Sequence, residues 1–184
     1  MKIIFKLMDF IVINHIRKNL IRHLFKYHIH LPFNCAEFGV YRGTTARYIS
    51  KETSKTLSLF DSFDGLPEDW NNNFKKGDFK LKQIPKLPDN TKLYKGLFKE
   101  TIPKFLCDYK KPLSFIHVDS DLYSSAKEIL FTLNDIIIPG TVLLFDEYSK
   151  GENSALREWL NKYTRSCILL RKTIHLQAAY MVIN

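Results

Sequence analysis

The chain has 184 residues, of which 45% are hydrophobic and 14% aromatic, a size and composition that suit one compact domain with a substantial core. Its cysteines, Cys35, Cys107 and Cys167, form neither a close pair nor a metal-type spacing. This disfavours a secreted disulfide framework and a zinc site. A reducing cytoplasm fits best, and we expect a cytoplasmic protein.

The net charge of +9 is partly local to the first thirty residues, where six basic residues stand against the single acid Asp9. The apolar spacing predicts a basic amphipathic helix within residues 1–32, and its charges interrupt every run before the ~20 apolar residues needed to cross a bilayer. We expect this helix to pack on the domain or on a partner, including a second copy of the chain. Weak membrane-surface contact is the alternative.

Residues 33–184 are predicted to form the catalytic core, because short β-branched or aromatic runs alternate there with helical patterns. This alternation is typical of a parallel sheet covered by helices. The last residues, 166–184, predict two strands that pair as an antiparallel hairpin. Together these patterns predict an α/β fold with helices on both faces, the Rossmann-like sheet of class I methyltransferases rather than that of dinucleotide dehydrogenases. Strands are expected over 33–39, 56–61, 91–96, 112–119 and 141–147, and helices over 44–51, 103–109, 125–134 and 154–163.

Two helix starts carry local signals. Pro103 suits a first helical position, and Ser125 with Glu128 has the spacing of a capping box. Both are expectations about where helices begin.

The first motif, EFGVYRGTT, predicts a strand, a tight turn from Gly39 to Gly43 and a helix that opens at Thr44. Glycines let the backbone approach a ligand closely, and the helix start offers free N–H donors and a positive dipole end. These features suit the methionine carboxylate of S-adenosylmethionine or a pyrophosphate. A strand-to-helix turn without a ligand is the alternative.

Asp61 ends the next predicted strand, 22 residues after Gly39, where a carboxylate can accept hydrogen bonds from the ribose hydroxyls of an adenosine. Its DSFDG context leaves a turn or capping role as the alternative. Gly96 and Leu97 follow the third strand and would border the adenine. The predicted cofactor-binding residues are Glu37, Gly39, Tyr41, Gly43, Thr44, Asp61, Ser62, Gly96 and Leu97.

Four carboxylates follow two apolar strands: Asp119 and Asp121 after the fourth, and Asp146 and Glu147 after the fifth. If the strands are neighbours, all four converge at one edge of the sheet. Like charges ~4 Å apart repel by ~4 kcal/mol at an effective dielectric constant of 20, so the cluster holds protons or binds a cation. Oxygen ligands favour Mg²⁺ or another hard divalent ion. Solvated loop-end acids are the alternative, and His117 is expected to be a hydrogen-bonded interior histidine.

Taken in order, EFGVYRG, DSFDGLP, KGLFKETIP, HVDSDLYSSAKEIL and PGTVLLFDEY closely resemble the macrocin O-methyltransferase (TylF) family over roughly residues 33–150. The resemblance implies S-adenosylmethionine, Mg²⁺ and methylation of a sugar hydroxyl. It also implies that Asp119, Asp146 and Glu147 bind the metal and that Asp121 is the general base. Glu147 stands where the family usually has Asp, and the short amino-terminal region is expected to form a partial lid.

Two rival hypotheses remain open at this stage. In the first, the Gly39 turn and Asp61 bind NAD for a redox reaction, and the carboxylates are incidental. In the second, the basic first helix and the lysine-rich residues 75–86 bind nucleic acid or anionic lipid without catalysis. These positive charges lack the interleaved aromatics of a stacking platform, so no nucleic-acid partner is expected.

Overall fold

The computed structural model describes residues 2–148, 150–174 and 177–184, without the side chains of residues 2–10 and 150. Within these ranges seven strands form one sheet in the order β3-β2-β1-β4-β5-β7-β6. Strands β1 to β5 are parallel, and β7 is antiparallel to both β5 and β6. The predicted parallel sheet with a terminal antiparallel hairpin is therefore confirmed. The strands are β1 (Asn34–Phe38), β2 (Leu57–Asp61), β3 (Thr91–Lys95), β4 (Leu113–Val118), β5 (Val142–Phe145), β6 (Cys167–Lys172) and β7 (Ala178–Val182).

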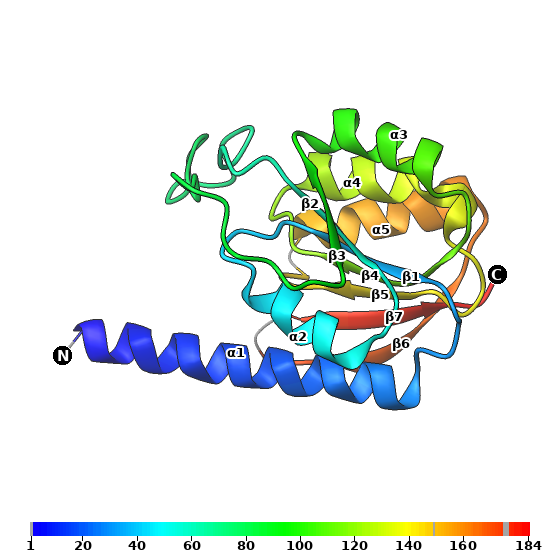
Figure 1. Cartoon of the computed structure of the whole chain (residues 1–184), viewed down its shortest axis with the longest axis horizontal. Helices are drawn as coiled ribbons and strands as arrows, with labels where there is room; N and C mark the ends of the chain where they lie inside the picture. The colour runs from blue at the N-terminus through cyan, green and yellow to red at the C-terminus, as the bar shows by residue number, and fades with distance from the viewer. Residues whose placement is uncertain (1, 149, 175–176) are drawn as a thin grey trace.

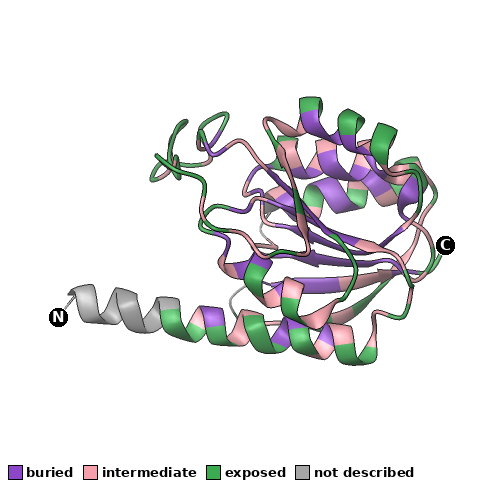
Figure 2. Ribbon diagram, in the orientation of Figure 1, coloured by how far each residue is buried: buried purple, intermediate pink, exposed green. Residues whose placement is uncertain are grey.

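Helices cover both faces of this sheet (Figure 1). Helices α1 and α2 pack on one face, around a core that includes Leu24, Ile49 and Phe115. Helices α3, α4 and α5 pack on the other, around a second core that includes Phe105 and Trp159. Burial is accordingly concentrated in the strands and on the helix sides that face them (Figure 2). The helices are α1 (Lys2–Tyr27), α2 (Thr44–Glu52), α3 (Phe98–Asp108), α4 (Tyr123–Thr132), the 3₁₀ turn η1 (Asn134–Ile136) and α5 (Lys150–Lys162).

Both predicted helix-start signals are wrong. Helix α3 begins at Phe98 rather than Pro103, because the amides of Glu100 and Thr101 already donate to the Leu97 carbonyl at 3.0 Å. Pro103 therefore lies inside the helix, where it lacks one backbone donor. Helix α4 begins at Tyr123, and its N-cap residue makes no side-chain hydrogen bond, so the capping box expected at Ser125 does not form.

Two segments flank the edge of the sheet at which β1, β2, β4 and β5 end, called here the carboxyl edge. The carboxyl-terminal half of α1 is held against the domain by buried Leu20, Ile21 and Leu24, whereas its first turns project past this edge (Figure 1). The long connection from 62 to 90 leaves the same edge on the other side. Among the described residues, no helix is long and apolar enough to span a membrane.

Candidate active site

The turn after β1 lies directly against the end of β4. Gly39 has φ of +90°, and a Cβ atom there would lie 1.8 Å from the carbonyl oxygen of Asp119. The amide of Asp119 in turn donates to the Phe38 carbonyl at 2.9 Å, and the Gly39 amide donates to Phe60 of β2 at 2.9 Å. Only a residue without a side chain permits this approach. Gly39 thus brings the predicted cofactor turn and the first predicted acid into contact.

Asp61 fastens the same turn to the end of β2. Its Oδ2 accepts the amides of Val40 and Tyr41 at 2.7 and 2.8 Å, and its Oδ1 accepts the amide of Phe63 at 2.7 Å. The turn-forming role left open by the sequence is therefore present. A carboxylate offers about four acceptor positions, so Asp61 keeps capacity for a ligand hydroxyl.

The remaining predicted cofactor residues fall into three groups. Gly43, with φ of +70°, precedes the helix that Thr44 opens, and Gly96 donates its amide to the Asp61 carbonyl at 3.0 Å, so these residues border the carboxyl edge. Glu37 lies elsewhere: it is fully buried inside the sheet, and its carboxylate contacts His117. Two further predicted residues have local roles, since Ser62 accepts the Asp64 amide and Leu97 is the N-cap of α3.

The four predicted acids come together as expected, because β4 and β5 are neighbours in the sheet. Asp119 and Asp121 follow β4, and Asp146 and Glu147 follow β5, whose end is tied to β4 by a 3.0 Å bond from the Asp146 amide to the Val118 carbonyl. Asp121 has φ of +61°, a left-handed conformation that Asp tolerates better than most residues.

Burial and mutual repulsion raise the pKa values of these acids. Burial and then the charge of Asp146 raise the pKa of Asp119 well above its usual range and also raise that of Glu147. Burial and then the charges of Glu147 and Asp146 raise the pKa of Asp121 to about 7. The negative charge of the cluster is therefore only partly neutralised by the protein itself.

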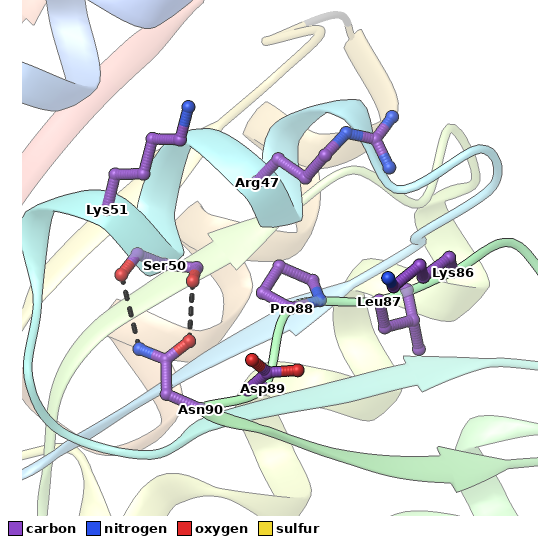
Figure 3. A pocket seen from close by; sticks show the side chains of 8 residues that line it. All are labelled: Arg47, Ser50, Lys51, Lys86, Leu87, Pro88, Asp89 and Asn90. Carbon is purple, nitrogen blue, oxygen red and sulfur yellow. Dashed lines mark hydrogen bonds between the residues drawn. The ribbon is translucent and has the colours of Figure 1, made fainter.

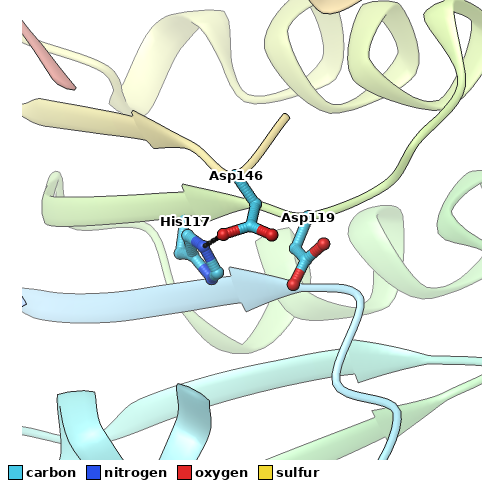
Figure 4. A group of neighbouring side chains, drawn as sticks. All are labelled: His117, Asp119 and Asp146. Carbon is cyan, nitrogen blue, oxygen red and sulfur yellow. Dashed lines mark ion pairs between the residues drawn. The ribbon is translucent and has the colours of Figure 1, made fainter. Parts of the chain in front are cut away.

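A compact group lies at the centre of this cluster. One ligand atom each from His117, Asp119 and Asp146 lies within 4.8 Å of the others (Figure 4). Among the described residues, Glu147, which the sequence also predicted as a ligand, does not belong to a group this tight. The structure therefore brings two of the three predicted metal ligands together with a histidine that the sequence assigned to the interior.

Arg17 reaches this cluster from α1. Its Nη2 contacts Oδ2 of Asp146, and its Nη1 lies 3.3 Å from Oγ1 of Thr45 in the first turn of α2. Gln177 donates from its Nε2 to the other oxygen of Asp146, Oδ1, at 2.9 Å. Neither residue was predicted: any of several basic residues of α1 fitted the sequence pattern equally well, and Gln177 lies just before β7 with no motif around it.

Glu152, in the first turn of α5, is a further acid that the sequence did not predict as part of the site. It is fully buried. Burial, followed by the charges of Asp146, Asp121 and Glu147, raises its pKa well above the usual range. The signal for it is weak, because an acid in the first turn of a helix is ordinary.

A hollow also lies along one side of α2. It has a volume of about 680 Å³ and is lined by residues of α2 and of the segment 86–90, including Arg47, Lys51 and Asp89 (Figure 3). Asn90 closes its floor by donating to the Ser50 and Thr53 carbonyls. Because β3 begins at Thr91, one end of this hollow adjoins the entry to that strand, whereas Arg47 and Leu87 at its other end lie beside Gly43.

Comparisons with known proteins agree with this layout. A sequence profile described as a methyltransferase domain matches residues 36–148. The solved structure of CalS11, a calicheamicin methyltransferase, has a TM-score of 0.74 at 20% identity and covers 89% of this chain and 77% of its own. The O-methyltransferase NovP has a TM-score of 0.70 at 22% identity, with coverages of 91% and 80%.

A third solved structure extends the likeness. An O-methyltransferase from Bacillus cereus, in complex with SAH, has a TM-score of 0.58 at 13% identity and covers 93% of this chain and 80% of its own. At these identities the likeness concerns the fold, and the class I methyltransferase fold predicted from the sequence is thereby confirmed. No curated protein sequence matches the chain.

Proposed function

The chain belongs to the family of methyltransferase domains, and we propose that it transfers a methyl group from S-adenosylmethionine to a hydroxyl group with the help of a divalent cation. The observation that carries this proposal is the convergence of Asp119, Asp121, Asp146 and Glu147 beside the Gly39 turn. A methyl donor bound at the turn and an acceptor bound at the acids would meet at one edge of the sheet.

S-adenosylmethionine fits the residues at the ends of β1, β2 and β3. The turn from Gly39 to Gly43 leads to the amino-terminal end of α2, where free amides and the helix dipole suit the methionine carboxylate. Asp61, with an acceptor position to spare, lies where ribose hydroxyls would approach. Gly96 and Leu97 complete the same edge on the adenine side.

A divalent cation also fits the residues present. Burial, and then repulsion between neighbouring carboxylates, raises the pKa values of Asp119, Asp121 and Glu147, and a bound cation would relieve both effects. Asp119, Asp146 and Glu147 would hold the ion, which would lower the pKa of an acceptor hydroxyl bound to it. Arg17 contacts Oδ2 of Asp146 and Gln177 donates to Oδ1, and a carboxylate oxygen that accepts one hydrogen bond keeps a lone pair for a cation.

The chemistry of the chain's own residues is then proton removal and alignment. The acceptor oxygen attacks the methyl carbon as the bond from that carbon to the sulfonium sulfur breaks, and S-adenosylhomocysteine leaves. Asp121 takes the hydroxyl proton, a role for which an accessible carboxylate with a pKa near neutrality is suited. No covalent enzyme intermediate is needed.

The family resemblance and one similar structure bear on the class of the acceptor. The order of motifs resembles the TylF family of sugar O-methyltransferases, and CalS11 is described as a TDP-rhamnose 3'-O-methyltransferase. We therefore propose a sugar hydroxyl, in a glycan or a glycosylated small molecule, as the acceptor. Residues 33–184 would form the catalytic core, and α1 would cover one side of the site.

The test measures transfer of a radiolabelled methyl group from S-adenosylmethionine to a panel of glycosides, with and without EDTA. We expect EDTA and Asp119→Ala each to abolish transfer, because both remove cation binding. Asp135→Ala is the matched control: this exposed acid belongs to η1, before β5, at the opposite end of the sheet. Full activity with EDTA and in Asp119→Ala would refute the metal role, and absence of S-adenosylmethionine binding would refute the methyl transfer.

A further inference from the structure

His117 has one ring nitrogen that the protein leaves without a hydrogen bond. The residue is completely buried in β4, and among the described residues its Nε2 has no hydrogen-bond partner. This nitrogen lies 3.9 Å from Oδ1 of Asp146, which is too far for a hydrogen bond (Figure 4). A buried nitrogen without a partner is unfavourable unless something else binds it.

Glu37 holds the other side of the ring. Glu37 of β1 and His117 of β4 are directly paired in the sheet, and Nδ1 of His117 lies 3.2 Å from Oε1 of Glu37. A proton on Nδ1 can therefore be donated to the carboxylate, which leaves the lone pair of Nε2 directed toward Asp146. Histidines that bind metals usually have this arrangement, with the second nitrogen bonded to a carboxylate.

Asp146 is fixed so that one oxygen faces His117. Arg17 contacts Oδ2, and Nε2 of Gln177 donates to Oδ1 at 2.9 Å. The carboxylate of Asp119 completes the group within 4.8 Å. Three potential ligands of two chemical kinds, one imidazole nitrogen and two carboxylates, thus face one another without a hydrogen bond between them.

We propose that His117 is a direct ligand of the divalent cation, oriented by Glu37, and that the site takes a first-row transition ion such as Mn²⁺ in preference to Mg²⁺. This inference rests on the proposed function, because the cation is the same one. Imidazole nitrogen binds transition ions much better than Mg²⁺, whereas carboxylates accept Mn²⁺ as well.

The test uses the full chain with Mn²⁺ and S-adenosylhomocysteine, and pulsed electron paramagnetic resonance detects nitrogen bound directly to the manganese. We expect a nitrogen coupling in the wild type and in His30→Gln, which alters an exposed histidine, and its loss in His117→Gln. Labelling all histidines with ¹⁵N should convert the coupling to that of ¹⁵N, which identifies histidine even if His117→Gln does not fold.

Calorimetric titration with Mn²⁺ and Mg²⁺ gives an independent readout. His117→Gln should weaken Mn²⁺ binding at least tenfold while changing Mg²⁺ binding little, and Glu37→Gln should weaken Mn²⁺ binding by about 10- to 100-fold while keeping the nitrogen coupling.

Two outcomes would overturn the inference. Bound Mn²⁺ without nitrogen coupling would leave an oxygen-only metal site, and with it the proposed function, intact. Methyl transfer without any Mn²⁺ binding would reject both metal assignments but not the transfer itself.

Discussion

The two halves of the carboxyl edge, one at the ends of β1 and β2 and the other at the ends of β4 and β5, differ in the groups that form them. At the ends of β1 and β2, backbone amides and glycines do most of the work, and the single important side chain, Asp61, is occupied by three amides. At the ends of β4 and β5, the buried Asp146 and the half-buried Asp119, Asp121 and Glu147 supply the functional groups. The first half is therefore sensitive to backbone shape, whereas the second is sensitive to charge and protonation.

The largest effect should come from the charged half. Asp121→Asn should lower kcat by about 10²- to 10⁴-fold, because it removes the proposed proton acceptor. In the wild type, kcat/KM should fall as the pH decreases, since the carboxylate must be ionised to accept a proton. Without a cation its pKa is raised to about 7, and a bound cation moves this fall to lower pH. Initial rates measured across pH 5.5–9 test both points.

The control for this substitution is Asp135→Asn, which changes an exposed acid far from the site. It should keep the full rate and the full pH profile. An Asp121→Asn protein with more than a tenth of the wild-type kcat would assign the proton transfer to another group.

The sequence predicts the residues at strand ends, but not the side chains that reach the site from elsewhere in the chain. Strand ends are visible in the periodicity, and the carboxyl-edge rule brings Asp119, Asp121 and Asp146 together once β4 and β5 are neighbours. The pairing of Glu37 with His117 requires knowledge that β1 lies beside β4. Arg17 reaches Asp146 across 129 positions, and no local pattern distinguishes it from the other basic residues of α1.

The two wrong helix starts show a second reason why the structure differs from the sequence prediction. Pro103 favours a first helical position, but proline, which has no backbone N–H, is also tolerated inside a helix whose other contacts are good. Phe105, two residues later, is buried in the core on the face covered by α3, α4 and α5, and Phe98 packs against that core. Tertiary packing therefore extends α3 by a turn that the local signal did not predict.

The next largest effect tests the backbone-built half. Gly39→Ala should lower the free energy of unfolding by about 3 kcal/mol or more, because its Cβ would lie 1.8 Å from the Asp119 carbonyl oxygen and its φ is +90°. Urea unfolding measures the change. Gly77→Ala is a close control, since Gly77 has φ of +88° but a Cβ there would meet nothing within 4 Å.

The two glycines separate steric contact from conformational strain. Gly77→Ala should cost only about 1 kcal/mol, the penalty of the left-handed backbone alone. Equal losses in the two variants would show that the approach of the turn to Asp119 is not a constraint on the fold.

The smallest effect is a gain in stability, and it concerns the charged side chains at the ends of β4 and β5. Burial and the charges of Asp146, Asp121 and Glu147 raise the pKa of Glu152 well above its unfolded value of about 4.3. Between these two pKa values the folded state binds more protons than the unfolded state, so stability decreases as the pH rises. Glu152→Gln removes this dependence and, in the presence of EDTA, should stabilise the protein at pH 8.

The stabilisation by Glu152→Gln should shrink steadily as the pH falls and vanish only below about 4.3, the unfolded pKa, where the wild-type carboxyl is protonated in both states. Glu158→Gln in the same helix is the control, because Lys127 lowers the pKa of that exposed acid and its removal should not stabilise. A stability gain independent of pH would mean that Glu152→Gln acts through packing. A gain that disappears on adding Mn²⁺ would instead show that the charged half is strained only until a cation balances it.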